Sequence, residues 1–124
     1  RPGWAYFKVG ELREASGRHA AAALAYSKAA ENRGQALFNM GRCYEKLRKT
    51  ALAKKAYESL RKVRPLNDSH RVGGLARLGL IYELEGKPRK AAQVYADILK
   101  NAPQGTVLEL ARKRLLALTK DGSL

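Results

Sequence analysis

Three segments of this 124-residue chain repeat one pattern of residue types at matching spacing. Apolar residues three or four apart mark one face of a helix, and each segment has two such stretches separated by a short polar break. Each segment therefore predicts a pair of helices. The pattern runs Leu37, Met40, Gly41, Tyr44, Ala53, Tyr57 and Pro65 in the second copy, Leu75, Leu78, Gly79, Tyr82, Ala91, Tyr95 and Pro103 in the third, and Tyr6, Val9, Gly10, Ala22 and Tyr26 in the first.

The central glycine of each copy lies inside the first helix of the predicted pair. Glycine in a helix interior costs about 1 kcal/mol relative to alanine, unless the absence of a side chain is needed there. We expect that need to be a close approach of the two helices. The alanine of each copy would supply the matching small surface on the second helix, and the tyrosine four residues later would fill the wider gap beyond it.

This pattern resembles the tetratricopeptide repeat, over roughly residues 4 to 103. The resemblance implies an all-α fold, built as a right-handed superhelical stack of three helix-turn-helix pairs that binds a partner. The central glycines are 31 and 38 residues apart, against about 34 in the family. The longer second junction, followed by a terminal helix, is weakly similar to the repeat arrays of bacterial periplasmic and outer-membrane-associated proteins.

We predict a single domain over residues 1–124, with repeats at about 3–33, 34–66 and 71–103 and a capping helix at about 106–118. A cap is expected because the last pair of a stacked array would otherwise expose its apolar face. The compartment is left open between the bacterial periplasm and the cytoplasm. The predicted helices span about 4–16, 20–31, 35–47, 51–63, 71–85, 89–101 and 106–118.

Nothing in the sequence indicates catalysis. His19 and His70 are far apart, and Cys43 stands alone and is expected to be a small buried side chain. The glycine-rich run at 73–79 continues into Leu80, where a phosphate-binding loop requires lysine. We therefore predict a non-enzymatic protein without metal or cofactor.

The aromatic residues suggest where a partner would bind. All six tyrosines occupy or lie close to packing positions, which leaves Trp4, Phe7 and Phe38 unexplained. In the family that the chain resembles, their side of the first helices faces the concave surface. Apolar anchors mixed with guanidinium groups would suit a peptide that carries a carboxylate. The expected groove is lined by Trp4, Phe7, Phe38, Asn39, Arg42, Arg77 and Leu80.

Other roles for these aromatics remain open. Trp4 and Phe7 would instead pack on a preceding segment, and Phe38 against the neighbouring pair. One subclass of the family grips the C-terminal carboxylate of chaperones with five polar residues, and only Asn39 and Arg77 match that set. The three other places hold Phe7, Glu11 and Gly73, so we disfavour chaperone tails, although a weaker acidic peptide could still use Asn39, Arg42 and Arg77.

Positive charge is the second unusual feature, with 25 Lys and Arg against 11 Asp and Glu, a formal net charge of +14. Three basic residues hold the same place in the turns inside the pairs, just before a helix begins, where a cation is unfavourable. Others follow in the next turn. We expect a basic ridge made of Arg18, Lys49, Lys54, Lys55, Lys87, Arg89 and Lys90.

Two functions follow from these features. The first is a protein-interaction scaffold that holds an acidic peptide or partner domain in its concave groove, as part of a larger assembly. The alternative is a binder of nucleic acid, anionic polysaccharide or anionic lipid headgroups along the ridge. The first is favoured because nucleic-acid readers interleave aromatics with basic residues, and here the unexplained aromatics lie on the groove.

Overall fold

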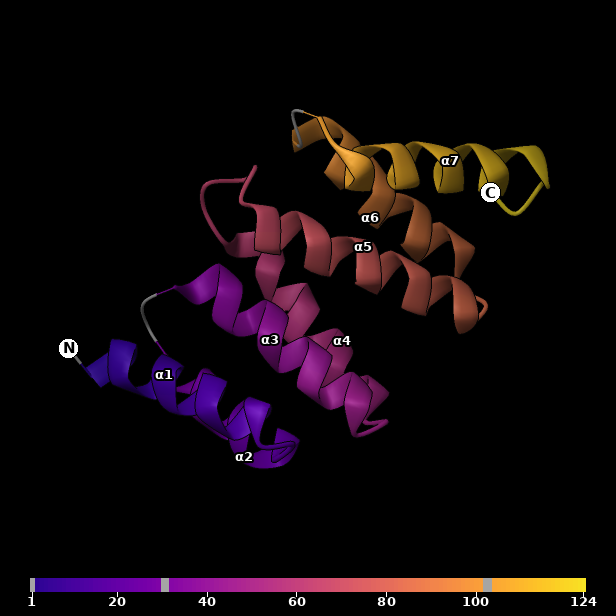
Figure 1. The fold of residues 1–124 in the computed structure, drawn as a ribbon. Coiled ribbons are helices and arrows are strands. Elements are labelled where there is room, and N and C mark those ends of the chain that lie inside the picture. Colours follow the sequence, from indigo (N-terminus) through magenta and orange to yellow (C-terminus); the bar gives the residue numbers. More distant parts are fainter. Residues whose placement is uncertain (1, 30–31, 102–103) are drawn as a thin grey trace. The chain divides into compact units, whose positions relative to one another are not determined.

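The computed structural model describes residues 2–29, 32–101 and 104–124, and all regular structure within them is helical (Figure 1). The chain divides into two compact units, of which the first ends at Val63 and the second begins at Arg64. The prediction of an all-α fold is confirmed. The right-handed superhelix and the single domain stay predictions. Pro103, the last residue of the third pattern copy, lies outside the described residues.

The first unit contains two helix pairs. The predicted helices agree with the observed ones to within a few residues, except that the second ends at Ser27, well before residue 31. Its end tightens because the amides of Lys28 and Ala29 donate to carbonyls three residues earlier. The elements are α1 (Pro2–Ala15), α2 (His19–Ser27), α3 (Arg33–Lys46), α4 (Thr50–Ser59) and the 3-10 helix η1 (Leu60–Lys62).

The second unit contains one further pair and a terminal helix. The Asp68 side chain accepts a hydrogen bond from the Arg71 amide at 2.9 Å, which caps the first of these helices. The terminal helix packs against both others and buries Ala111 and Leu118. The elements are α5 (Ser69–Leu84), α6 (Pro88–Asn101) and α7 (Thr106–Lys120).

A glycine and a tyrosine make the closest contact within each helix pair. A Cβ atom added to Gly41 would lie 2.2 Å from the Tyr57 ring, and Gly10 and Gly79 face equivalent rings at 2.6 and 2.5 Å. The absence of a side chain is therefore needed to make room for the second helix of the pair, as predicted. However, it is the tyrosine ring, and not an alanine, that occupies the space of the missing side chain. The alanines of the pattern are fully buried beside it.

The core of the first unit corrects two expectations. Phe7 is only 4% exposed and packs against Tyr26 of α2 at 5.6 Å between ring centroids. Tyr6 is 40% exposed, and its ring lies 5.5 Å from the Lys28 ammonium instead of in the core. Cys43 is fully buried, and burial raises the pKa of its thiol to about 11, which leaves it protonated near neutral pH.

The turns inside the three helix pairs share one backbone conformation. In each, a left-handed residue precedes the basic residue that leads into the second helix: Gly17 (φ 76°), Arg48 (φ 59°) and Gly86 (φ 70°). The following amide then donates to the carbonyl five residues earlier, at 2.8 to 2.9 Å. Only the second turn places a residue with a Cβ in this region, where glycine is favoured.

Candidate functional site

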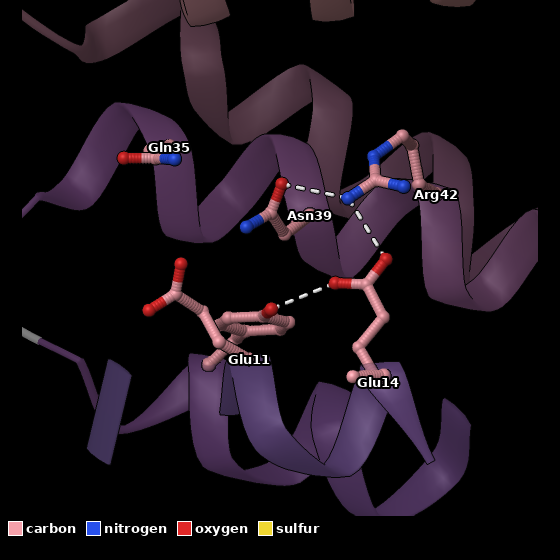
Figure 2. Close-up of a pocket in the computed structure, with 7 residues that line it drawn as sticks. Glu11, Glu14, Gln35, Asn39 and Arg42 are labelled. Carbon is pink, nitrogen blue, oxygen red and sulfur yellow. Dashed lines mark hydrogen bonds and ion pairs between the residues drawn. The ribbon is translucent and has the colours of Figure 1, made fainter. Parts of the chain in front are cut away.

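The first unit holds an open polar pocket of about 480 Å³ between α1 and α3 (Figure 2). Its position follows from helical spacing, because residues three or four apart share one face of a helix. The polar stripe of α1 therefore faces the polar stripe of α3. The lining residues are Glu11, Glu14 and Ala15 of α1, Tyr26 of α2, and Gln35, Asn39 and Arg42 of α3.

Hydrogen bonds and an ion pair hold one end of the pocket in place. The Tyr26 hydroxyl donates to Glu14 Oε1 at 2.7 Å, and Arg42 Nη2 lies 2.8 Å from Glu14 Oε2. The same Nη2 donates to Asn39 Oδ1 at 3.0 Å, and the guanidinium lies 5.5 Å from the centre of the Phe38 ring. Three helices are thus joined through one carboxylate.

The two carboxylates of the pocket differ in how firmly they are paired. Glu14 is bound by a cation and a hydroxyl, whereas the Glu11 carboxylate meets Lys8 at 3.1 Å in a solvent-exposed pair on the same helix. Asn39 is only 7% exposed, so its amide is a fixed part of the wall. Burial, followed by the hydrogen bond to Glu14, raises the pKa of Tyr26 above its ordinary value, so the hydroxyl stays a proton donor.

The structure places the predicted groove residues in different surroundings. Asn39 and Arg42 line the pocket together. Phe7 is buried in the core against Tyr26, so its assignment to a partner-binding surface is wrong. Trp4 is 51% exposed on α1, beyond the residues that line the pocket.

The remaining predicted groove residues lie elsewhere. Phe38 is half-buried and tilts against Tyr57 of its own pair at 6.4 Å between ring centroids. Arg77 is exposed and Leu80 half-buried, both on α5 of the second unit. Their part in a common groove stays a prediction.

Sequence reasoning missed most of the carboxylate and amide wall. From the sequence, Glu11 is only a mismatch to the chaperone-binding set, and Glu14, Gln35 and Tyr26 are not expected in the site. A signal was present, since a glutamate stands four residues after each central glycine. In the second and third copies that glutamate again accepts from the tyrosine, at 2.5 Å for Glu45 and Tyr57 and 2.6 Å for Glu83 and Tyr95.

The second unit contains a related network at its terminal helix. Glu83 of α5 accepts from the Tyr95 hydroxyl of α6 and pairs with Arg114 of α7. Arg114 Nε donates to Glu83 Oε2 at 3.0 Å, and its Nη2 donates to the other carboxylate oxygen. These hydrogen bonds from Arg114 hold the pKa of Glu83 below its ordinary value of 4.5.

The predicted ridge residues lie on the surface, in both units. Arg18, Lys49 and Lys87 directly precede α2, α4 and α6, as expected, and neither Arg18 nor Lys49 makes a side-chain capping bond. All three are exposed, as are Lys55, Arg89 and Lys90, whereas Lys54 is half-buried. Lys87 lies 3.7 Å from Glu85. A continuous ridge across the chain stays a prediction.

The described residues also bear on metal binding and on membrane crossing. No cluster of three or more His, Cys, Asp or Glu side chains within them is arranged to hold a metal ion. Their helices also include none with the length and apolar character needed to cross a membrane.

Part of the chain matches the model of a known protein family. The family model described as tetratricopeptide repeat matches residues 35–66 and 75–105, just over half of the chain. These ranges contain the second and third copies of the pattern. The first copy shares their glycine–tyrosine contact and their tyrosine–glutamate hydrogen bond. No curated protein matches the chain.

Proposed function

The chain belongs to the tetratricopeptide repeat family, and we propose that it is a non-enzymatic interaction module that binds a segment of a partner protein in the α1–α3 pocket. Repeats of this family generally mediate protein–protein interaction and scaffolding. The observation that carries the proposal is the pocket itself, a concave polar surface built from two successive repeats. Concave surfaces with a few fixed polar groups are the usual places for ligands.

The fixed geometry of the pocket supports binding. Arg42 and Asn39 are oriented by each other and by Glu14, which Tyr26 also binds. A ligand that meets these groups does not have to order them, and binding loses less conformational entropy as a result. The pocket thus offers a partner a preformed set of hydrogen-bonding groups.

The positive charge of the surface around the pocket supports an acidic partner. The sequence of the first unit has 14 basic and 5 acidic side chains, a net charge of +9. Exposed basic residues such as Arg18, Lys49 and Lys55 would attract an acidic protein over a distance of about a Debye length and speed its association. We propose that the ridge performs this attraction and that the pocket makes the specific contact.

A matched pair of glutamine variants tests the proposal. Gln35 lines the pocket, whereas Gln93 is exposed on α6. The probes are acidic, neutral and basic sets of acetylated and amidated dodecapeptides, together with a DNA duplex, and binding is followed by fluorescence polarisation. Gln35→Ala should weaken the affinity for the peptides that bind by about threefold or more, because one hydrogen-bonding side chain of the pocket wall is lost. Gln93→Ala should leave their affinity unchanged.

Two results would contradict the proposal. One is equal peptide affinity in both glutamine variants, which would place the binding surface outside the pocket. The other is binding of the duplex alone, with an affinity that falls steeply as salt rises, which is the behaviour of a polyanion-binding ridge.

A further inference from the structure

We propose that the α1–α3 pocket takes a lysine or arginine side chain of the partner segment. This inference rests on the proposed function, because it specifies the chemistry of the residue that enters the same pocket. The partner would then be acidic where it faces the ridge and would present one cationic side chain to the pocket.

The charge count within the pocket carries the first step. Its lining includes two carboxylates, Glu11 and Glu14, and one guanidinium, Arg42, in a chain whose net charge is +14. Glu14 is satisfied by Arg42 at 2.8 Å and by the Tyr26 hydroxyl at 2.7 Å. Glu11 is therefore the carboxylate that remains for a ligand.

The partner that Glu11 already has is weakly held. Lys8 lies one turn earlier on α1, with its ammonium 3.1 Å from Glu11, and both side chains are exposed. Exposed ion pairs at this helical spacing contribute little to stability. A cation delivered by a partner can displace Lys8 at little cost.

The arrangement of the lining carries the second step. Figure 2 shows Glu11 of α1 and Gln35 of α3 toward one end of the pocket, and Glu14 and Arg42 paired toward the other end. Carboxylate and amide oxygens at the first end are acceptors, which suit an ammonium or guanidinium donor. The aliphatic stem of such a side chain could lie along Ala15 and the Tyr26 ring, which also line the pocket.

The same arrangement disfavours an anion. A carboxylate entering the pocket would meet Glu11 and Glu14, while the Arg42 guanidinium that could offset them is already bound to Glu14 and Asn39. Like charges at short range raise the free energy of the complex. The geometry therefore moves acidic recognition from Asn39 and Arg42 to the exposed ridge.

Four pentapeptides that differ at one residue test the inference. The probes are acetylated and amidated Gly-Ser-X-Ser-Gly, with X as Arg, Lys, Gln or Glu, titrated into the full chain labelled with ¹⁵N. We expect the Arg and Lys peptides to shift the amide signals of Glu11, Gln35 and Asn39, and to bind at least about fivefold more tightly than the Gln and Glu peptides.

Matched substitutions then identify the carboxylate. Glu11→Gln should weaken the Arg peptide about fivefold, because it removes the carboxylate that is held only by the exposed Lys8. Glu58→Gln makes the same change of charge on α4 and should leave the affinity unchanged. Lys8→Gln should strengthen binding about twofold by removing the competing ammonium, and it should do so more than Lys62→Gln, which makes the same charge change at η1.

The outcomes separate the inference from the proposed function. Equal binding of all four peptides at the pocket signals, or equal effects of Glu11→Gln and Glu58→Gln, would overturn the cationic anchor and leave a peptide-binding pocket in place. If neither these pentapeptides nor the dodecapeptides shift the pocket signals, both the inference and the proposed function are overturned.

Discussion

The two units build the same carboxylate–tyrosine network and complete it with arginines in different positions. In the first, Arg42 shares one nitrogen between Glu14 and Asn39, and an open pocket lies beside them. In the second, Arg114 directs two nitrogens to Glu83. The comparison teaches that one repeated motif can serve two purposes. It fixes the wall of an open pocket in one unit and joins the terminal helix to its neighbours in the other.

The units also differ at one arginine that recurs eight residues before the central glycine. Arg71, at the start of α5, is 1% exposed, and it donates to the Leu66 carbonyl at 2.8 Å and pairs with Asp97 at 3.1 Å. Arg33, at the start of α3, is exposed. The position equivalent to Asp97 in that pair holds Ser59, which has no charge to offer a guanidinium.

The largest expected effect tests the comparison between Arg71 and Arg33. Arg71→Ala should lower the free energy of unfolding by about 3 to 5 kcal/mol, since it leaves Asp97 without its buried cation. Arg33→Ala should change it by no more than about 0.5 kcal/mol. Urea unfolding followed by circular dichroism measures both. Similar losses in the two variants would show that burial of Arg71 does not account for its contribution.

A smaller effect is expected at the terminal helix, where Arg114 completes the carboxylate–tyrosine network of the second unit. Arg114→Ala should cost about 1 to 2 kcal/mol at neutral pH, because Glu83 loses two charge-assisted hydrogen bonds in a partly exposed place. Arg112→Ala on the same helix removes only the exposed pair with Glu109 and should cost a few tenths of a kcal/mol.

The loss of stability in acid should reveal the ion pair between Glu83 and Arg114. The pKa of Glu83 is lowered on folding, so its contribution to stability is fully present above its ordinary value of 4.5 and is lost as the pH falls through the lowered pKa. The wild-type chain should therefore lose more stability than Arg114→Ala when unfolding is measured from neutral pH down into this range. Parallel pH curves for the two proteins would refute the assigned role of the pair.

The smallest effect should be shared by both units. Tyr26→Phe and Tyr95→Phe should each cost about 1 kcal/mol, because each removes a hydrogen bond to the network glutamate. Burial and that bond raise the pKa of both tyrosines above 10.0, so their contribution is present below this pH and is lost as the pH rises through the raised values.

Alkaline unfolding curves would test this equivalence. Each Phe variant should be less sensitive to high pH than the wild-type chain, and exposed Tyr6→Phe serves as the control. A clear difference between Tyr26→Phe and Tyr95→Phe would mean that the choice of arginine changes the strength of the tyrosine–glutamate bond.

Spacing in the sequence was enough to predict the helix pairs, because a glycine that a tyrosine ring must approach leaves little freedom in register. It was not enough to predict which face of α1 is buried. Phe7 is an aromatic three residues before its glycine, and only the packed structure shows that it meets Tyr26. The different surroundings of Arg71 and Arg33 depend on Asp97, 26 residues along the chain from Arg71, so the helix pattern alone does not reveal them.

Of the candidate site, Asn39 and Arg42 were predicted and the acidic wall was not. A sequence shows which charged residues could attract an outside ligand, but not which ones are paired within the protein. Glu14 is paired in this way, with Tyr26 and Arg42. Such internal pairing decides the remaining charge of a pocket, and it depends on distances that a sequence does not contain. The recurrence of a glutamate and a tyrosine in all three copies was the one sequence signal for it.

The left-handed Arg48 has a consequence for protein engineering. Gly17 and Gly86 show what the same turn tolerates best, so the chain contains its own template for redesign. Replacing Arg48 by glycine would relieve the backbone and would also delete a positive charge next to Lys49. A designer who uses this repeat as a building block must therefore choose, at this one loop, between a more robust scaffold and a more cationic surface.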